Sequence, residues 1–115
     1  MKYLLAFIAP DLRSHVVDAL VSAHVPGMTI SDAHGFGHDH DATHPEYNVL
    51  DSFEMSKKLR IEIFCHDQDV EKLLQAIYAS AHTGHRGDGK VFVMDVSDAL
   101  RLKNGEHGAS AIGPP

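Results

Sequence analysis

The residues best suited to chemistry lie in one short glycine-rich segment, His82-Thr83-Gly84-His85-Arg86-Gly87-Asp88-Gly89-Lys90. Its three glycines allow backbone N–H groups to approach an anion closely, and Lys90 adds a positive charge beside them. This pattern indicates a binding site for phosphate groups. A plain glycine-rich turn before a strand would have the same composition, so both interpretations stay open from this segment alone.

A pair of cations follows near the C-terminus. Arg101 and Lys103 flank Leu102, so in a strand both charges would point to the same side. Two such charges could clamp a polyphosphate. The alternative interpretation is a solvated edge strand that its charges protect from pairing with other chains.

Histidine is unusually frequent, with 10 among 115 residues. One polar stretch contains the candidate metal ligands His38, Asp39, His40 and His44. In an extended chain residues i and i+2 face the same way, so His38 and His40 could share one ion, and a turn could bring in His44. Zn²⁺, Ni²⁺, Cu²⁺ or Co²⁺ would suit these ligands. The alternative is a solvated loop that faces a partner protein.

The overall composition argues against several classes of protein. A formal net charge of −6 disfavours nucleic-acid binding, which needs clustered Lys and Arg. The single cysteine, Cys65, cannot form an internal disulfide, which favours a reducing, cytoplasmic location. The apolar run after Lys2 ends at Pro10, so we expect a buried first strand rather than a signal peptide. No triad-like or paired-carboxylate pattern is present at useful spacing, and we expect no catalytic residues and no enzyme activity.

The hydrophobic pattern predicts the elements that must position these residues. Strands are expected at 1–9, 28–36, 59–63 and 90–96. Helices should open at Asp11 and Asp67, with Val25-Pro26-Gly27 ending the first of them. A short helical turn at 97–100 and a brief strand at 101–103 should follow. The order β-α-β-β-α-β predicts a ferredoxin-like α+β fold, in which two helices cover one face of an antiparallel sheet.

This architecture leaves one sheet face uncovered, so we expect subunits to pack there. A single domain is expected over residues 1–112, with a loose tail at 113–115. Residues 37–57 show no sustained periodicity, although an ordinary hairpin loop needs only about two to five residues. Long loops inside compact domains are usually functional, and the polar composition of this one predicts that it projects into solvent.

Taken together, these segments resemble the PII signal-transduction family along nearly the whole chain. The matching segments are Gly27-Met28-Thr29, Gly35-Phe36-Gly37, Lys58 to Ile63, Thr83-Gly84, Gly87-Asp88-Gly89-Lys90-Val91-Phe92-Val93 and Arg101 through Glu106. The spacing also fits, including the length of the long loop. Only the tip of that loop and the C-terminal tail differ, which indicates a PII-like branch with a divergent, His-rich loop.

The resemblance implies a homotrimer that binds ATP or ADP, or also AMP, in the clefts between neighbouring subunits. The long loop, called the T-loop in this family, would dock on a protein target such as a membrane transporter or an enzyme. By similarity, the backbone of 87–89 with Lys90 would hold phosphates, and Arg101 and Lys103 would reach across from the adjacent subunit. Besides Lys90, Arg101 and Lys103, the nucleotide-binding residues implied are Gly27, Met28, Thr29, Gly35, Phe36, Gly37, Lys58, Glu62, Ile63, Phe64, Thr83, Gly84, Gly87, Asp88 and Gly89. Thr83 and Ile63 would lie near the base and ribose.

Three departures from the family pattern carry consequences. Asp39 stands where typical members use a glutamine for 2-oxoglutarate; a carboxylate could bind Mg²⁺ but would repel that dicarboxylate. Asp51 occupies the position of the modified tyrosine and Tyr47 is out of register, so uridylylation is not expected. Lys103 replaces an arginine and loses its bidentate fork. The alternative function is a metal-responsive PII-like protein, linked to heavy-metal efflux or tolerance through the T-loop histidines.

Overall fold

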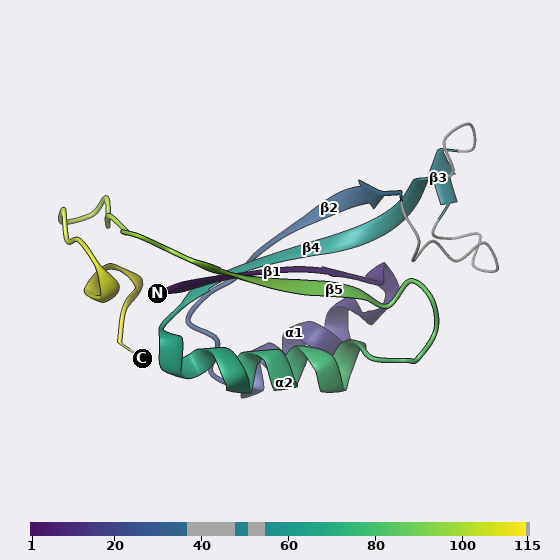
Figure 1. The fold of residues 1–115 in the computed structure, drawn as a ribbon, viewed down its shortest axis with the longest axis horizontal. Coiled ribbons are helices and arrows are strands. Elements are labelled where there is room, and N and C mark those ends of the chain that lie inside the picture. Colours follow the sequence, from purple (N-terminus) through teal and green to yellow (C-terminus); the bar gives the residue numbers. More distant parts are fainter. Residues whose placement is uncertain (37–47, 51–54, 115) are drawn as a thin grey trace.

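The chain folds into one antiparallel sheet with two helices packed on the same face (Figure 1). The computed structural model describes residues 1–36, 48–50 and 55–114, with the backbone alone for 48–50 and 55. The strands are β1 (Lys2–Ile8), β2 (Thr29–Gly35), β3 (Asn48–Leu50), β4 (Met55–Cys65) and β5 (Gly89–Asp95). The helices are α1 (Arg13–Ser22) and α2 (Val70–Ala81). The strand order β2-β4-β1-β5, with β3 paired to β4, confirms the predicted ferredoxin-like topology.

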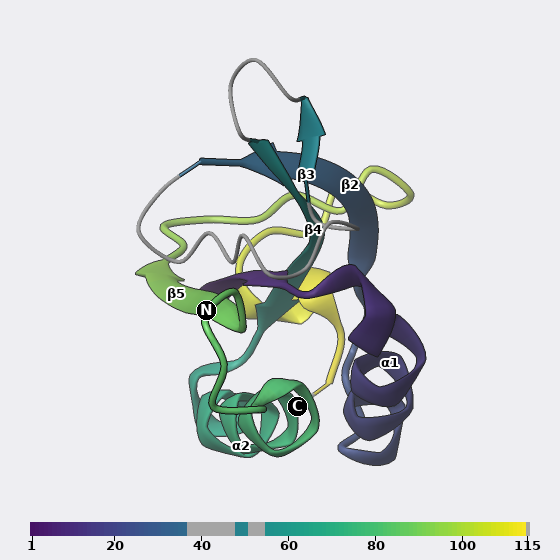
Figure 2. The same cartoon turned by 90° about the vertical axis from the view of Figure 1, so that its right-hand side faces the viewer.

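The core lies between the sheet and the helices, which run side by side below it in Figure 2. Every second residue of the two central strands faces the helices, because successive side chains of a strand alternate between its faces. The fully buried side chains include Leu4 and Ile8 of β1, Leu59, Ile61 and Ile63 of β4, Val16 and Leu20 of α1, and Leu73 and Ile77 of α2. The alternation of Leu59, Ile61 and Ile63 in the sequence therefore predicted correctly which side chains of β4 face the core.

The opposite face of the sheet, which we call the open sheet face, is not covered by any helix of the described chain. It carries large apolar side chains from two strands. Phe64 of β4 and Phe92 and Met94 of β5 remain 48%, 47% and 41% exposed. Because monomeric proteins rarely leave such side chains clustered in water, this face is suited to contact with another protein surface.

The long loop is shorter than its predicted bounds of 37–57. Strand β4 begins at Met55, and β3 pairs antiparallel with it through Asn48 and Ser56. A three-residue strand is too short to produce a recognisable period in the sequence. Residues 37–47 and 51–54 lie outside the described part of the chain.

Both helices begin later than predicted, because short 3-10 turns precede them. Asp11 lies in the turn Pro10–Leu12 and Asp67 in the turn Asp67–Asp69. The carboxylate of Asp67 instead accepts a hydrogen bond from the N-terminal ammonium group of Met1 at 2.9 Å. Each helix is therefore entered through a 3-10 turn.

The predictions for 97–100 and 101–103 were wrong. Residues 97–100 form no helix, and Asp98 instead accepts hydrogen bonds from the N–H groups of Ala99 and Gly108 at 2.9 and 3.1 Å. Arg101 opens a turn, in which its N–H donates to Glu106 and its carbonyl accepts from Gly105, both at 2.8 Å. Gly105 adopts a φ of 75°, which reverses the chain. Arg101 and Lys103 therefore lie in a turn and not on one side of a strand.

The predicted loose tail is attached at its first residue. His66 Nε2 lies 2.6 Å from the carbonyl oxygen of Gly113, and that carbonyl can only accept the hydrogen bond. A 3-10 turn at Ala109–Ile112 precedes it.

None of the helices in the described residues is long and apolar enough to cross a bilayer.

Helix α1 ends before the predicted stop at Val25-Pro26-Gly27. His24 adopts a left-handed conformation with a φ of 60°. The N–H of His24 bonds to the carbonyl of Val21 and the N–H of Val25 to that of Leu20, both at 3.0 Å. These two bonds form a Schellman motif, in which glycine is the usual left-handed residue. Histidine in this position therefore stores backbone strain.

Replacing His24 by glycine should raise the free energy of unfolding by about 0.5–1 kcal/mol, because glycine adopts a positive φ without steric cost. Urea or thermal unfolding measures this change. Ala23→Gly is the matched control, since Ala23 has a φ of −85° and glycine there should destabilise. A His24→Gly variant no more stable than wild type would contradict the strain argument.

Candidate functional site

The loop between α2 and β5 is organised around the carboxylate of Asp88. This carboxylate accepts hydrogen bonds from the backbone N–H groups of Thr83 and Gly84, both at 2.8 Å, and from the Thr83 hydroxyl. Gly84, Gly87 and Gly89 have φ values of 86°, 93° and 98°. Glycine is needed here because other residues rarely adopt such backbone angles. These hydrogen bonds tie the two ends of the loop together, and we call residues 83–90 the phosphate loop after the role that the family resemblance implies.

Asp88 is held in its charged form by these contacts. Burial raises the pKa of its carboxyl group, but the hydrogen bonds from Thr83 and Gly84 and the nearby His82 outweigh this effect and leave the pKa below its ordinary value. Nδ1 of His82 lies 3.7 Å from Asp88 Oδ2. The side chains of Thr83 and Asp88 therefore hold the shape of the loop.

Replacing Asp88 by asparagine should lower the free energy of unfolding at pH 7 by about 1–2 kcal/mol, because the amide cannot match three charge-assisted hydrogen bonds. A carboxyl whose folded pKa is depressed stabilises the fold above its unfolded pKa of about 4 and loses that contribution as pH falls through the lower folded value. The difference between variant and wild type should therefore shrink below about pH 4.

Chemical unfolding at pH 7, 5 and 2.5 tests this pH dependence. Asp18→Asn, on the exposed side of α1, is the matched control and should change stability by less than about 0.5 kcal/mol. A difference for Asp88→Asn that stays the same at all three pH values would show that the charge of Asp88 is not what stabilises the loop.

Lys58 connects the base of the T-loop to the phosphate loop. Its ammonium group donates to the carbonyl oxygen of Gly87 at 2.7 Å. A Cβ atom placed on Gly35, at the end of β2, would lie 3.6 Å from Lys58 Cγ, so these residues are neighbours. Phe36, the last described residue before the long loop, is 74% exposed. The structure therefore brings Gly35, Lys58 and the phosphate loop together at one end of the sheet.

A second group of predicted residues lines a pocket of about 250 Å³ near the start of β2. Its walls are Pro26, Gly27, Met28, Thr29, Glu62, Phe64 and Ile112. Thr29 lies opposite Glu62 in the register of β2 and β4. The pocket combines the aromatic ring of Phe64 with a hydroxyl and a carboxylate, and we call it the base pocket. Two lining residues, Pro26 and Ile112, were not among the predicted site residues, and the 3-10 turn at Ala109–Ile112 places Ile112 there.

Within one chain these two groups do not meet. Lys58 and Glu62 are four residues apart on β4, a separation of about 13 Å along an extended strand. In Figure 1 the phosphate loop and the segment after β5 lie at opposite ends of the sheet. That segment contains Arg101, whose Nε donates to the carbonyl of Ala111 at 3.2 Å, and the exposed Lys103. The structure of a single chain therefore separates Arg101 and Lys103 from Lys90.

Ile63 belongs to the core between the sheet and the helices. Its side chain is buried in the core and only 1% exposed, so any contact with a ligand would come from its backbone. Gly37 and the candidate metal ligands His38, Asp39, His40 and His44 lie outside the described residues, as do Tyr47 and Asp51. In the described part of the chain no three His, Cys, Asp or Glu side chains gather as a metal site would require.

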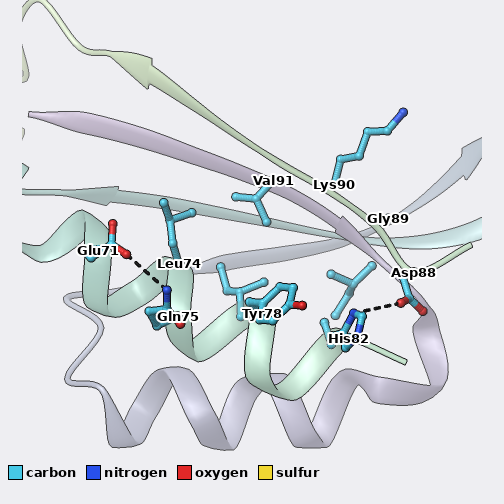
Figure 3. A pocket seen from close by; sticks show the side chains of 12 residues that line it. Glu71, Leu74, Gln75, Tyr78, His82, Asp88, Gly89, Lys90 and Val91 are labelled. Carbon is cyan, nitrogen blue, oxygen red and sulfur yellow. Dashed lines mark hydrogen bonds and ion pairs between the residues drawn. The ribbon is translucent and has the colours of Figure 1, made fainter. Parts of the chain in front are cut away.

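A cavity of about 390 Å³ lies between α2 and β5 (Figure 3). It was not predicted. Leu74 and Val91 line its apolar part. Tyr78 and His82 also line it, and their rings are stacked with centroids 4.8 Å apart. In Figure 3 the Lys90 side chain extends from β5 away from this cavity. Lys90 is therefore directed to the other side of the strand, away from α2.

Comparison with known proteins places this arrangement in one family. A family model described as nitrogen regulatory protein P-II matches residues 1–106. The nitrogen regulatory protein P-II of Azospirillum brasilense is 36% identical over 112 residues, which cover 97% of this chain and 100% of that protein. The nitrogen regulatory protein P-II 1 of Methanothermobacter thermautotrophicus is 37% identical over 113 residues and 97% of both chains. Because these matches run nearly from end to end and the fold agrees with them, the chain belongs to the nitrogen regulatory protein P-II family.

Proposed function

We propose that this protein is a cytoplasmic regulator without enzyme activity that binds ATP or ADP in clefts between the subunits of a homotrimer. The observation that carries the proposal is the separation of the predicted site into two groups at opposite ends of one sheet. A second chain must supply the missing half, because one chain cannot bring Lys90 and Arg101 together.

The phosphate loop suits the polyphosphate end of a nucleotide. Its glycines form a tight turn with positive φ values, a conformation that can present backbone N–H groups to an anion, and Lys90 follows them on the exposed side of β5. Arg101 and Lys103 of a neighbouring subunit would add two positive charges to balance the phosphates. Mg²⁺ would accompany ATP, since the phosphate oxygens are its preferred ligands.

The base pocket suits a purine. Phe64 and Met28 offer apolar surface for a flat ring, while Thr29 and Glu62 offer hydrogen-bonding groups at its edge. Its volume of about 250 Å³ is small for a whole nucleotide, which fits a pocket that holds the base alone. The phosphate groups would then extend toward the phosphate loop of the adjacent subunit.

The open sheet face supports assembly. Burying the half-exposed rings of Phe64 and Phe92 and the side chain of Met94 against another subunit would gain roughly 25 cal/mol for each Å² removed from water. A closed symmetric oligomer would cover this face on every subunit at once.

The bond between Lys58 and Gly87 suggests how binding is transmitted. Phosphates that reach the backbone at Gly87 would compete with, or reorient, the ammonium group that now donates to its carbonyl. Lys58 lies beside the base of the T-loop, so the occupied and empty sites would favour different T-loop conformations. The T-loop would dock on a protein target such as a transporter or an enzyme. Binding of a transition metal by the T-loop histidines stays a prediction.

Isothermal titration of the whole protein with ATP, ADP and AMP tests the proposal, with light scattering to measure the oligomeric state. We expect three nucleotides bound per trimer and affinities that differ with the number of phosphates. A monomer that binds none of the three nucleotides would overturn the proposal.

A further inference from the structure

A tyrosine outside the predicted site contacts two residues of the base pocket. The hydroxyl of Tyr3 donates a hydrogen bond to Glu62 Oε2 at 2.7 Å. The ring of Tyr3 stacks on that of Phe64, with centroids 4.7 Å apart and planes 11° from parallel. Glu62 and Phe64 line the base pocket, whereas Tyr3 does not. Tyr3 therefore lies directly behind the wall of the pocket.

The register of the sheet explains these contacts. Tyr3 of β1 is the direct partner of Phe64 on β4, so their rings meet as a cross-strand pair. The Tyr3 hydroxyl then reaches the diagonal neighbour Glu62, two residues along β4. The hydrogen bond to Glu62 raises the pKa of the Tyr3 phenol, with burial as the next cause.

The other carboxylate oxygen of Glu62 also has a partner. Glu62 Oε1 lies 3.4 Å from Arg60 Nε, and the same Nε donates to the hydroxyl of Ser31 at 3.0 Å. Each oxygen of Glu62 is thus approached by one donor. A carboxylate has about four acceptor positions, so about two remain for donor groups of a ligand.

We infer that Tyr3 is a positioning residue of the nucleotide cleft, whose hydroxyl fixes the Glu62 carboxylate and whose ring fixes Phe64 before a purine base binds. This inference rests on the proposed function. A glutamate on the surface of a strand would otherwise sample several rotamers, and ordering it only on binding costs affinity. Tyr3 removes that cost in advance, because both residues of the pocket wall are already held in one geometry.

The test is Tyr3→Phe, which keeps the ring stack and removes only the hydroxyl. Isothermal titration should show ATP binding about three- to tenfold weaker than wild type, the loss expected for one side chain that is no longer preorganised. The melting temperature should stay within a few degrees of wild type, since a hydrogen bond at a partly exposed carboxylate contributes little to folding. Tyr78→Phe on α2 is the matched control, with the same chemical change outside the cleft, and should bind ATP as wild type does.

A double-mutant cycle with Glu62→Ala separates positioning from a general structural effect. If Tyr3 acts through Glu62, Tyr3→Phe should cause no further loss of ATP affinity once the carboxylate is absent. A loss of equal size in the Glu62→Ala background, or wild-type affinity for Tyr3→Phe itself, would overturn the inference. Wild-type protein that binds no nucleotide at all would instead overturn the proposed function, so the two failures can be told apart.

Discussion

Gly89→Ala should remove most of the stability of the fold, with or without nucleotide. A Cβ atom at position 89 would lie 1.7 Å from the carbonyl oxygen of Phe7 and 2.8 Å from its carbonyl carbon. The φ of 98° at Gly89 would add backbone strain to this clash. Strand β1 cannot move aside, because it is paired with β4 on one side and β5 on the other.

The expected cost is about 3–6 kcal/mol, the sum of a steric overlap and a residue held at a positive φ. A domain of this size has about 5–15 kcal/mol of stability in total, so the variant should be largely unfolded or recovered as aggregate. Circular dichroism and urea unfolding measure this loss directly.

Gly105→Ala is the matched control, since Gly105 also has a positive φ, of 75°, but no heavy atom lies within 4 Å of the Cβ position. It should cost only about 1 kcal/mol, the strain of the backbone angle alone. Gly89→Ala protein that melts within a few degrees of the control would show that β1 and β5 separate more easily than their pairing suggests.

Gly89 also shows what the sequence could and could not predict. The glycine-rich pattern of residues 84–89 suggested backbone N–H groups available to an anion, which stays a prediction, and the structure gives Gly84, Gly87 and Gly89 positive φ values. The close approach of the Phe7 carbonyl is a contact between β1 and β5, which are far apart in sequence. A local pattern carries no information about it, so the structural need for this glycine was missed.

The contrast between local patterns and long-range contacts also explains why the core was predicted, the strand at 101–103 was wrong and Tyr3 was missed. The core was predicted because the alternation of Leu59, Ile61 and Ile63 is a local signal with a physical period. The strand at 101–103 was wrong because alternating polarity over three residues is outweighed by the turn at Gly105 and by the hydrogen bonds of Asp98. Tyr3 was missed because it is 59 residues from Glu62 in sequence and only the sheet register joins them.

Two variants that each bind ATP weakly should restore binding when they are mixed in one trimer. Lys90→Ala removes a cation beside the phosphate loop, and Arg101→Ala removes one from the opposite end of the sheet. Each variant alone should bind ATP about ten- to a hundredfold more weakly, for the loss of about 1.5–3 kcal/mol in charge-assisted hydrogen bonds.

Equal amounts of the two variants, unfolded together and refolded, should form mixed trimers. A cleft between a subunit that keeps Lys90 and a neighbour that keeps Arg101 is complete, and random mixing makes about a quarter of the clefts complete. Titration should therefore reveal about a quarter of the sites at wild-type affinity. Variants refolded separately and then combined are the control and should show none if subunits do not exchange.

Replacing Arg101 also removes its hydrogen bond to Ala111, so the experiment should be repeated with Lys103→Ala, which removes a positive charge at an exposed position. The recovered fraction discriminates between two geometries. If Lys90 and Arg101 of the same chain formed the site, every chain in the mixture would lack one of them and no cleft could recover. Recovery of about a quarter requires that each ligand is held by the phosphate loop of one subunit and the C-terminal turn of the next. The separation of these two segments in the single chain is what makes the mixture, rather than either variant alone, the informative measurement.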